Sequence, residues 1–277
     1  MDSVDLALGE AVGSLLVTLE GGVATVTLSR PERHNAITLA MWEAFGRLMP
    51  FLAGSDDVEV VLFRGPPGGP FSAGADISEF TALRSTPEAA ERYGEAVTSG
   101  ERAIISFPKP TVAMVEGFAI GGGAQVALAC DLRLCEDGSR FGITPAKLGI
   151  VYALASTARL VDLVGPAWAS YLLMTGDLVD APTALRIGLV HHVHHARDDL
   201  EAGTAELVAT LTSRAQVSLL GAKALVGKVS AGVRQDDDEA RRHYRDSLHS
   251  PEYAEGVAAF LAKRAPDFRG ARARPSG

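Results

Sequence analysis

Short apolar runs alternate with longer segments of helical spacing through the first half of the chain. The runs with strand character are 15–19, 23–28, 58–63, 110–115 and 132–135. The first two flank Glu20-Gly21-Gly22, a pattern that predicts a β-hairpin. The segments with helical spacing are 37–52, which Asn35 is expected to cap, 87–105 and 123–130. Strands and helices that alternate in this way predict an α/β core.

Helical segments follow one another through the second half. They cover 157–163, 167–174, 182–187, 198–213, 215–226, 236–247 and 251–264. The polar residues 270–277 are expected to form a frayed end. The pattern therefore predicts an α/β core followed by a helical C-terminal region.

Composition and charge narrow the classes of function. The 277 residues are 47% hydrophobic, enough for a sizeable core, and carry a formal net charge of −8. An acidic chain is a poor partner for nucleic acid. The two cysteines, Cys130 and Cys135, form neither a disulfide framework nor a zinc motif, which favours a reducing cytoplasm. We expect no signal peptide, no membrane span and no membrane partner, because no suitable apolar run is present.

Two glycine-rich stretches are the strongest candidates for chemistry. They are Phe71-Ser72-Ala73-Gly74-Ala75-Asp76-Ile77 and Gly117-Phe118-Ala119-Ile120-Gly121-Gly122-Gly123-Ala124-Gln125. Three glycines before an apolar helix let a ligand approach bare N–H groups, and the helix dipole adds positive potential there. Such an arrangement can hold a developing oxyanion. A plain strand-to-helix turn is the alternative explanation of the triplet.

Both stretches resemble the two signature segments of the crotonase (enoyl-CoA hydratase/isomerase) superfamily. Other segments agree in the same order. These are Arg30-Pro31 to Asn35-Ala36, which is similar to the CoA-binding loop, Cys130-Asp131-Leu132, Leu148-Gly149-Ile150, Gly188-Leu189-Val190 and the terminal helix from Glu255-Gly256 to Lys263-Arg264. The resemblance covers residues 14–268.

The resemblance implies a fold and a site. It implies a ββα spiral core over 1–200 and a helical region for oligomerisation or as a lid over 201–277, in trimers that often pair into hexamers. It implies an acyl-CoA thioester substrate without metal or redox cofactor, and an enolate held by the N–H groups of Ala75 and Gly122. The residues expected to contact substrate are Ala36, Ala73, Asp76, Ile77, Gln125, Pro145 and Lys263. From its position alone, Asp76 is expected to be a capping or turn carboxylate rather than a catalyst.

The sequence departs from the resembled family at two catalytic positions. Hydratases of the family use two glutamates, where this chain has Gln125 and Pro145. An amide is no useful proton acceptor near neutral pH, and proline has no polar side-chain group. The ordinary hydration mechanism is therefore not expected.

The segment Thr144-Pro145-Ala146 with Leu148 to Tyr152 resembles the methylmalonyl-CoA decarboxylase branch. In that branch a tyrosine at the position of Tyr152 faces the substrate carboxylate, although Ala75 and Ala153 replace a histidine and an asparagine. Loss of CO₂ generates an enolate without a base. We therefore expect decarboxylation of a short malonyl-type thioester. The alternatives are a hydratase or isomerase with another acid–base pair, and a silent CoA-binding relative.

A histidine-rich segment, His191-His192-Val193-His194-His195, is a further candidate for metal binding. Strand alternation would divide these side chains between two faces. The resembled family has a polar, variable strand end at this place, so the resemblance implies a solvated strand end, and no metal site is expected.

Overall fold

The main sheet of the computed structural model, which describes residues 3–273, has six strands. Their order is β1 (Leu15–Glu20), β2 (Val23–Leu28), β3 (Val60–Arg64), β4 (Thr111–Val115), β6 (Leu132–Glu136) and β9 (His192–His194). β1 and β2 form the expected antiparallel hairpin, with Leu15 opposite Leu28, and the other neighbouring strands are parallel. Gly21 and Gly22 make the turn with positive φ angles of 57° and 90°, which glycine adopts most readily.

A second, three-stranded sheet was not expected from the apolar pattern. Its strands, in the order given, are β5 (Phe118–Ile120), β7 (Arg140–Gly142) and β8 (Leu178–Asp180). Each has only three residues, too few to show an alternating pattern. The sheet matters for the site, because β5 leads directly into the glycine triplet.

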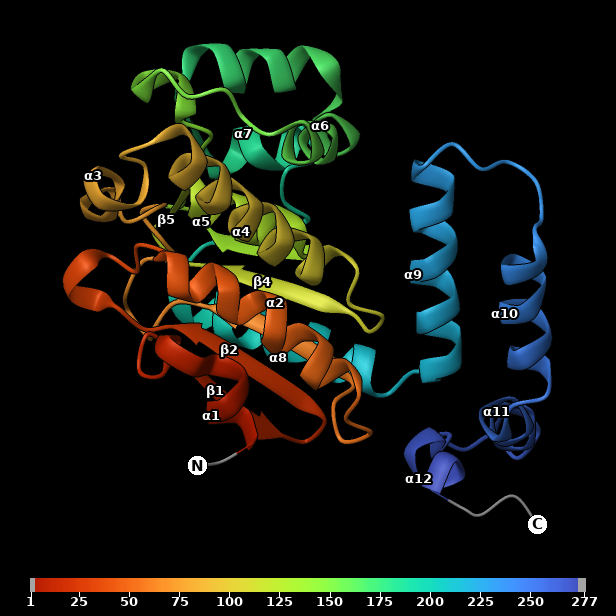
Figure 1. Cartoon of the computed structure of the whole chain (residues 1–277). Coiled ribbons are helices and arrows are strands. Elements are labelled where there is room, and N and C mark those ends of the chain that lie inside the picture. The colour runs from red at the N-terminus through yellow and green to blue at the C-terminus, as the bar shows by residue number, and fades with distance from the viewer. Residues whose placement is uncertain (1–2, 274–277) are drawn as a thin grey trace.

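Helices cover both faces of the main sheet. α2 (Leu39–Ala53) and α4 (Pro87–Ile105) lie together on one face, whereas α8 (Arg197–Thr212) packs against β3, β4, β6 and β9 (Figure 1). Side chains of β3 alternate between the two cores: Val61 and Phe63 pack with α2, and Val60 and Leu62 pack with α8. The mixed α/β architecture is therefore confirmed.

Two local details differ from the expectation or refine it. Thr38, and not Asn35, caps α2, by accepting a hydrogen bond from the Met41 N–H. Asn35 instead has a positive φ of 57°, and its side chain joins Arg30 N to the carbonyl of Pro70.

The remaining helices of the core are α1 (Ser3–Leu8), α3 (Phe80–Leu83), α5 (Gly122–Ala129), α6 (Leu154–Thr175), which is broken at Gly165, and α7 (Ala181–Arg186).

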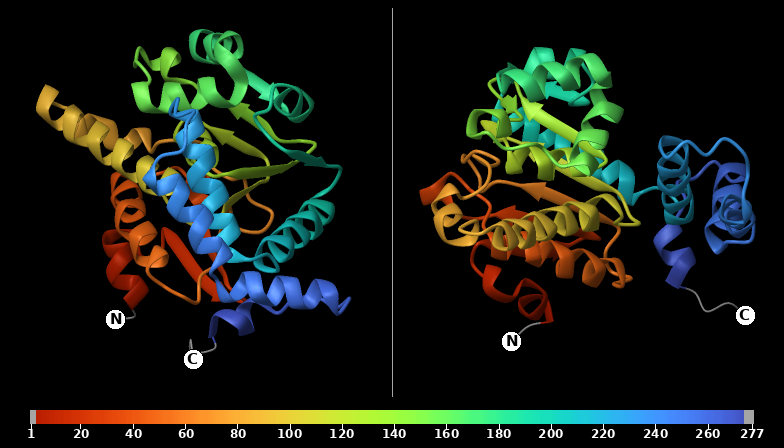
Figure 2. Two further views of the ribbon diagram at one scale, coloured as in Figure 1. Left: turned by 90° about the vertical axis from the view of Figure 1, so that its right-hand side faces the viewer. Right: turned by 45° about the horizontal axis from the view of Figure 1, so that its top comes forward.

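The C-terminal helices form a group at one side of the core. This group contains α9 (Gln216–Ser230), α10 (Asp238–Leu248), α11 (Pro251–Leu261) and α12 (Phe268–Ala273) (Figures 1 and 2). The expected boundary at 200/201 falls inside α8, which packs on the sheet, so α8 belongs with the core by its contacts. α12 covers part of the segment expected to be frayed, and residues 274–277 lie outside the described residues.

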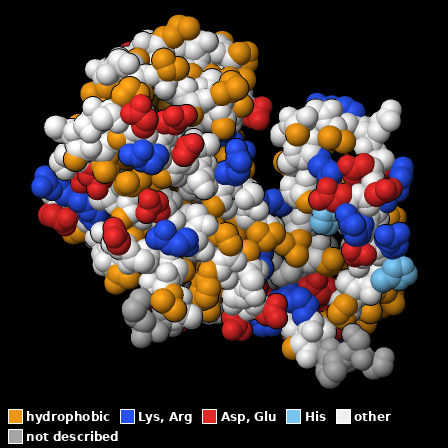
Figure 3. Space-filling view, in the orientation of Figure 1, with side chains coloured by type: hydrophobic (Ala, Val, Ile, Leu, Met, Phe, Trp, Pro, Cys, Tyr) orange, Lys and Arg blue, Asp and Glu red, His pale blue; other side chains and the backbone are white. Residues whose placement is uncertain are grey.

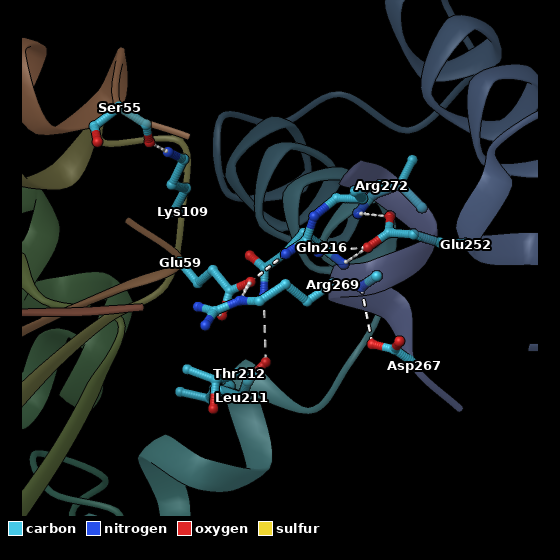
Figure 4. A network of polar contacts seen from close by, with 12 residues as sticks. Ser55, Glu59, Lys109, Leu211, Thr212, Gln216, Glu252, Asp267, Arg269 and Arg272 are labelled. Atoms are coloured by element: carbon cyan, nitrogen blue, oxygen red, sulfur yellow. Dashed lines mark hydrogen bonds and ion pairs between the residues drawn. The ribbon is translucent and has the colours of Figure 1, made fainter. Parts of the chain in front are cut away.

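Ion pairs hold α12 against the core. Glu59, which immediately precedes β3, is paired with Arg272 and, at 2.9 Å, with Arg269 (Figure 4). Arg272 also contacts Glu252 at 2.6 Å, and Glu252 accepts the N–H of Gln216 at the start of α9. Both glutamates are buried, and their contacts link α9, α11 and α12 to one another and to Glu59.

Apolar side chains remain exposed on both parts of the molecule. In the space-filling view, hydrophobic side chains gather on the core surface beside the C-terminal helices (Figure 3). On α9 and α11, Val226, Val229, Phe260 and Leu261 are exposed. None of the helices within residues 3–273 is long and apolar enough to cross a membrane.

Candidate active site

The two glycine-rich stretches meet at the end of β5. A backbone bridge pairs Ser72 with Ala119, and the Ser72 N–H donates to the carbonyl of Phe118. Gly74 has a φ of 112°, and a Cβ there would lie only 2.9 Å from the carbonyl oxygen of Ile120. Only glycine fits this close approach of two backbones without a shift.

The two expected oxyanion donors come together in this arrangement. A Cβ built on Gly122 would lie 3.2 Å from the nitrogen of Ala75. Neither N–H donates to another group among residues 3–273, and Gly122 is the first residue of α5, where an N–H has no helical acceptor. Two free N–H groups at a helix N-terminus can bind a carbonyl oxygen that gains negative charge.

A cavity of about 330 Å³ opens beside these two residues. It is bounded by the two glycine-rich loops, by α4, and by the segment that leads from β7 into α6. Among the described residues that line it, Arg84 is the single charged side chain and no carboxylate is present. Its wall is otherwise mostly apolar, which suits a short acyl group.

Most of the residues expected at the site line this cavity. Those that do are Ala73, Ala75, Ile77, Gly122, Gln125, Pro145 and Tyr152. Ala36, Asp76 and Lys263 are not among its lining residues. Ala36 lies before α2 and accepts a hydrogen bond from Arg30, while Lys263 follows α11 in the C-terminal group. The contacts of these three residues with substrate stay a prediction.

Asp76 has a clear local role. It caps the short helix Ile77–Glu79 by accepting from the Ser78 N–H, and it pairs with Arg30 at 2.9 Å. Burial opposes its ionisation, but the bonds to Ser78 and Arg30 outweigh that effect, so the pKa of Asp76 lies below its ordinary value. The interpretation of Asp76 as a cap is therefore confirmed.

A buried carboxyl group that sequence reasoning missed lies behind Gln125. Glu101, on α4, is 2% exposed and accepts hydrogen bonds from Gln125 Nε2 at 2.8 Å and Ser156 Oγ at 2.5 Å. Gln125 Nε2 also donates to Ser156 Oγ at 2.9 Å, which closes the triangle. Tyr93, Val97 and Glu101 are spaced four residues apart along α4, so a carboxylate within an apolar helical stripe was the available signal.

The ionisation of Glu101 is perturbed. Burial raises its pKa above the ordinary glutamate value, while hydrogen bonds from Ser156 and Gln125 and the charge of Arg159 partly oppose the rise. Gln125 and Ser156 line the cavity, whereas Glu101 stands behind them. The site therefore has an ionisable carboxyl group one side chain away from the substrate space.

Tyr152 lies in the cavity wall, two residues before α6 begins. Burial and the charge of Glu101 both raise the pKa of its phenol, while a hydrogen bond with Ser156 lowers it. The phenol consequently stays protonated at any physiological pH and can act as a hydrogen-bond donor.

Three polar groups in the cavity wall lack partners among the described residues. They are the indole N–H of Trp42, Nε of Arg84 and the hydroxyl of Tyr93. The Arg84 guanidinium stacks on Phe80 and Tyr93, at 3.8 and 4.3 Å from their ring centroids. Buried polar groups are rarely left unpaired, so these atoms favour a ligand with polar or anionic atoms.

The histidine-rich segment does not join the site. His192 and His194 belong to β9, paired with β6 in the main sheet. Within the part of the chain that the structure describes, no group of three or more His, Cys, Asp or Glu residues could hold a metal ion.

Comparisons with known proteins agree with this geometry. The sequence profile of the family described as Enoyl-CoA hydratase/isomerase matches residues 18–271. A carnitinyl-CoA dehydratase of Citrobacter koseri is 33% identical over 262 residues, which are 93% of this chain and 98% of the relative. A crotonyl-CoA hydratase of Syntrophomonas wolfei is 31% identical over 262 residues, 93% of this chain and 98% of the relative.

A solved structure shows the same fold. The chain is similar to an enoyl-CoA hydratase/isomerase family protein of Hyphomonas neptunium, with a TM-score of 0.88 and 33% identity, over 92% of this chain and 97% of the other. The family match covers both glycine-rich loops and most of the C-terminal helices. The chain therefore belongs to the enoyl-CoA hydratase/isomerase (crotonase) family and is an acyl-CoA-processing enzyme.

Proposed function

We propose that this enzyme decarboxylates a short malonyl-type acyl-CoA. The observation that carries the proposal is the character of the cavity wall, which has one charged side chain, the cation Arg84, and no carboxylate among its described lining residues. A carboxylate in the wall would repel a substrate carboxylate, whereas a guanidinium attracts it. Tyr152 supplies a protonated phenol in the same wall, which can orient the departing group.

The reaction needs little from the protein beyond these groups. The bond between the α-carbon and the carboxylate breaks, CO₂ leaves, and the electron pair forms an enolate. Its negative charge on the thioester oxygen is held by the N–H groups of Ala75 and Gly122. The α-carbon then takes up one proton, supplied in the overall reaction by solvent water, which gives the shorter acyl-CoA.

The test is CO₂ release from malonyl-, methylmalonyl- and ethylmalonyl-CoA by the purified enzyme. We expect release from at least one of the three, with the matching acyl-CoA as the second product. An enzyme that binds these esters and releases no CO₂ would contradict the proposal.

Addition or elimination of water is a second candidate, favoured by a separate observation. In hydratases of the family two glutamates transfer the proton. Here Glu101 and Ser156, which are hydrogen-bonded to each other, could transfer it instead. The similar proteins of Citrobacter koseri and Syntrophomonas wolfei are themselves named as a dehydratase and a hydratase. Crotonyl-CoA hydration at a rate near that of an ordinary hydratase would favour this candidate. Absence of both reactions would favour a silent CoA-binding relative.

We also propose an assembly and a setting. Exposed apolar residues on α9 and α11, including Phe260 and Leu261, support a trimer or a pair of trimers. Sedimentation velocity should then show a trimer or hexamer, and a monomer would contradict it. Catalysis without metal or redox cofactor, in the cytoplasm, completes the proposal.

A further inference from the structure

A hydroxyl and a carboxyl group form one hydrogen-bonded pair behind the cavity wall. The Ser156 Oγ donates to Glu101 Oε2 at 2.5 Å and accepts from Gln125 Nε2 at 2.9 Å. The three side chains come from α6, α4 and α5, and each is at least nine-tenths buried. The amide of Gln125, which donates to both partners, therefore sets the direction of the proton between Ser156 and Glu101.

We propose that Ser156 and Glu101 form a proton relay to the substrate α-carbon. Ser156 lines the cavity and faces the substrate, and Glu101 acts through it as the group that stores the proton. Gln125 and Pro145 stand where hydratases of the family have two catalytic glutamates. The relay supplies the proton transfer that those glutamates would perform. The proposal rests on the enolate chemistry that decarboxylation and hydration share, and not on either reaction alone.

The step balances in both directions. When an α-hydrogen is removed, the proton passes to Ser156 Oγ while the Ser156 hydroxyl proton passes to Glu101 Oε2. The C–H electron pair becomes the enolate, held at Ala75 and Gly122, and Glu101 becomes a neutral acid. In the reverse direction, neutral Glu101 returns a proton through Ser156 to the α-carbon of an enolate.

The surroundings of Glu101 suit this exchange. Burial makes its neutral form accessible at a higher pH than for a solvated glutamate, and Arg159 on α6 is the nearby cation that limits this effect. The other titratable neighbour is Tyr152, whose phenol stays protonated. A carboxyl group that is hydrogen-bonded to Ser156 can accept a proton as a carboxylate and return it as a neutral acid.

The test is exchange of the α-hydrogens of butyryl-CoA in D₂O, followed by mass spectrometry. A saturated ester undergoes neither decarboxylation nor hydration, so exchange reports only on enolate formation and the relay. We expect exchange by the wild-type enzyme, and a loss of about 100-fold or more in Glu101→Gln and Ser156→Ala. The affinity for butyryl-CoA should change by no more than about 3-fold, since both changes act on proton transfer.

Two further measurements separate a relay from a purely structural role. The wild-type exchange rate should fall as pH is lowered and Glu101 is protonated, and Glu101→Gln should lack this limb. Glu95→Gln is the matched control, because Glu95 is exposed on the same helix. Glutamine keeps an oxygen that can accept the hydrogen bond from Ser156, so we expect Glu101→Gln to fold. Thermal unfolding of the variant checks this.

Either of two outcomes overturns the relay. One is a wild-type enzyme that binds butyryl-CoA and catalyses no exchange. The other is a Glu101→Gln variant that exchanges at the wild-type rate with the wild-type pH profile. Exchange by the wild type without CO₂ release from the malonyl-type esters supports the relay and contradicts decarboxylation, so the two proposals fail separately.

Discussion

Replacing Gly122 by proline tests the oxyanion hole with little change to the fold. Gly122 is the first residue of α5, the helix position where proline is best tolerated because its missing N–H has no helical partner. The preceding Gly121 has no Cβ to clash with the proline ring. The substitution therefore removes one N–H from the cavity and leaves the helical hydrogen bonds of α5 in place.

The size of the effect follows from the role of that N–H. Loss of one oxyanion donor typically lowers turnover by about 10²–10³, or about 2.7–4 kcal/mol of transition-state stabilisation. A Cβ at position 122 would also lie 3.2 Å from the Ala75 nitrogen and 3.3 Å from Trp42 Cζ2, which is a tight fit. Gly122→Ala has the same Cβ and keeps the N–H, so it measures the steric part by itself.

The assays are butyryl-CoA exchange in D₂O and CO₂ release from malonyl-type esters, with thermal unfolding as the control for folding. We expect Gly122→Pro to lose at least about 100-fold in each detectable activity, and Gly122→Ala to lose much less. A folded Gly122→Pro enzyme with the activity of Gly122→Ala would refute the assignment of this N–H to the oxyanion.

Three further predictions concern the cavity wall. Tyr152→Phe should slow CO₂ release by about tenfold or more, because the hydroxyl stabilises the transition state more than the bound substrate. Its affinity for acetyl-CoA, measured by calorimetry, should stay nearly constant. A variant as fast as the wild type would return Tyr152 to a packing role. Arg84→Met should weaken the binding of a stable malonyl-CoA analogue by about tenfold or more compared with its effect on acetyl-CoA binding, since only the analogue has a carboxylate. Equal losses of affinity for both ligands would contradict this. Burial raises the folded-state pKa of Glu101, so its contribution to stability is present at low pH and is lost as pH rises through that pKa. The stability of Glu101→Gln relative to wild type should therefore increase with pH in urea unfolding, and a constant difference from about pH 4 to 8 would contradict it.

Local patterns in the sequence were enough to predict the hairpin, the longer elements and the two loops of the site. The hairpin turn at Gly21-Gly22 and the break of α6 at Gly165 depend on backbone angles that glycine adopts most readily. Apolar periodicity likewise predicted the long helices and most strands of the main sheet. The short strands β5, β7 and β8 escaped prediction, because three residues carry no readable period.

The candidate site depended on contacts between distant residues. The glycine-rich loops could be found in the sequence, but the approach of Ala75 to Gly122 required the bridge between Ser72 and Ala119. Asn35 illustrates the same limit, because its long-range bond to Pro70 outweighs its tendency to cap a helix.

Glu101 shows most clearly what only the tertiary structure decided. In the sequence it is one of several glutamates on an amphipathic helix, and its position in an apolar stripe was a weak signal. Its partners Gln125 and Ser156 lie 24 and 55 residues away and on two other helices. Burial and hydrogen bonding from these partners change the chemistry of a carboxyl group, and both arise only when the three helices pack together.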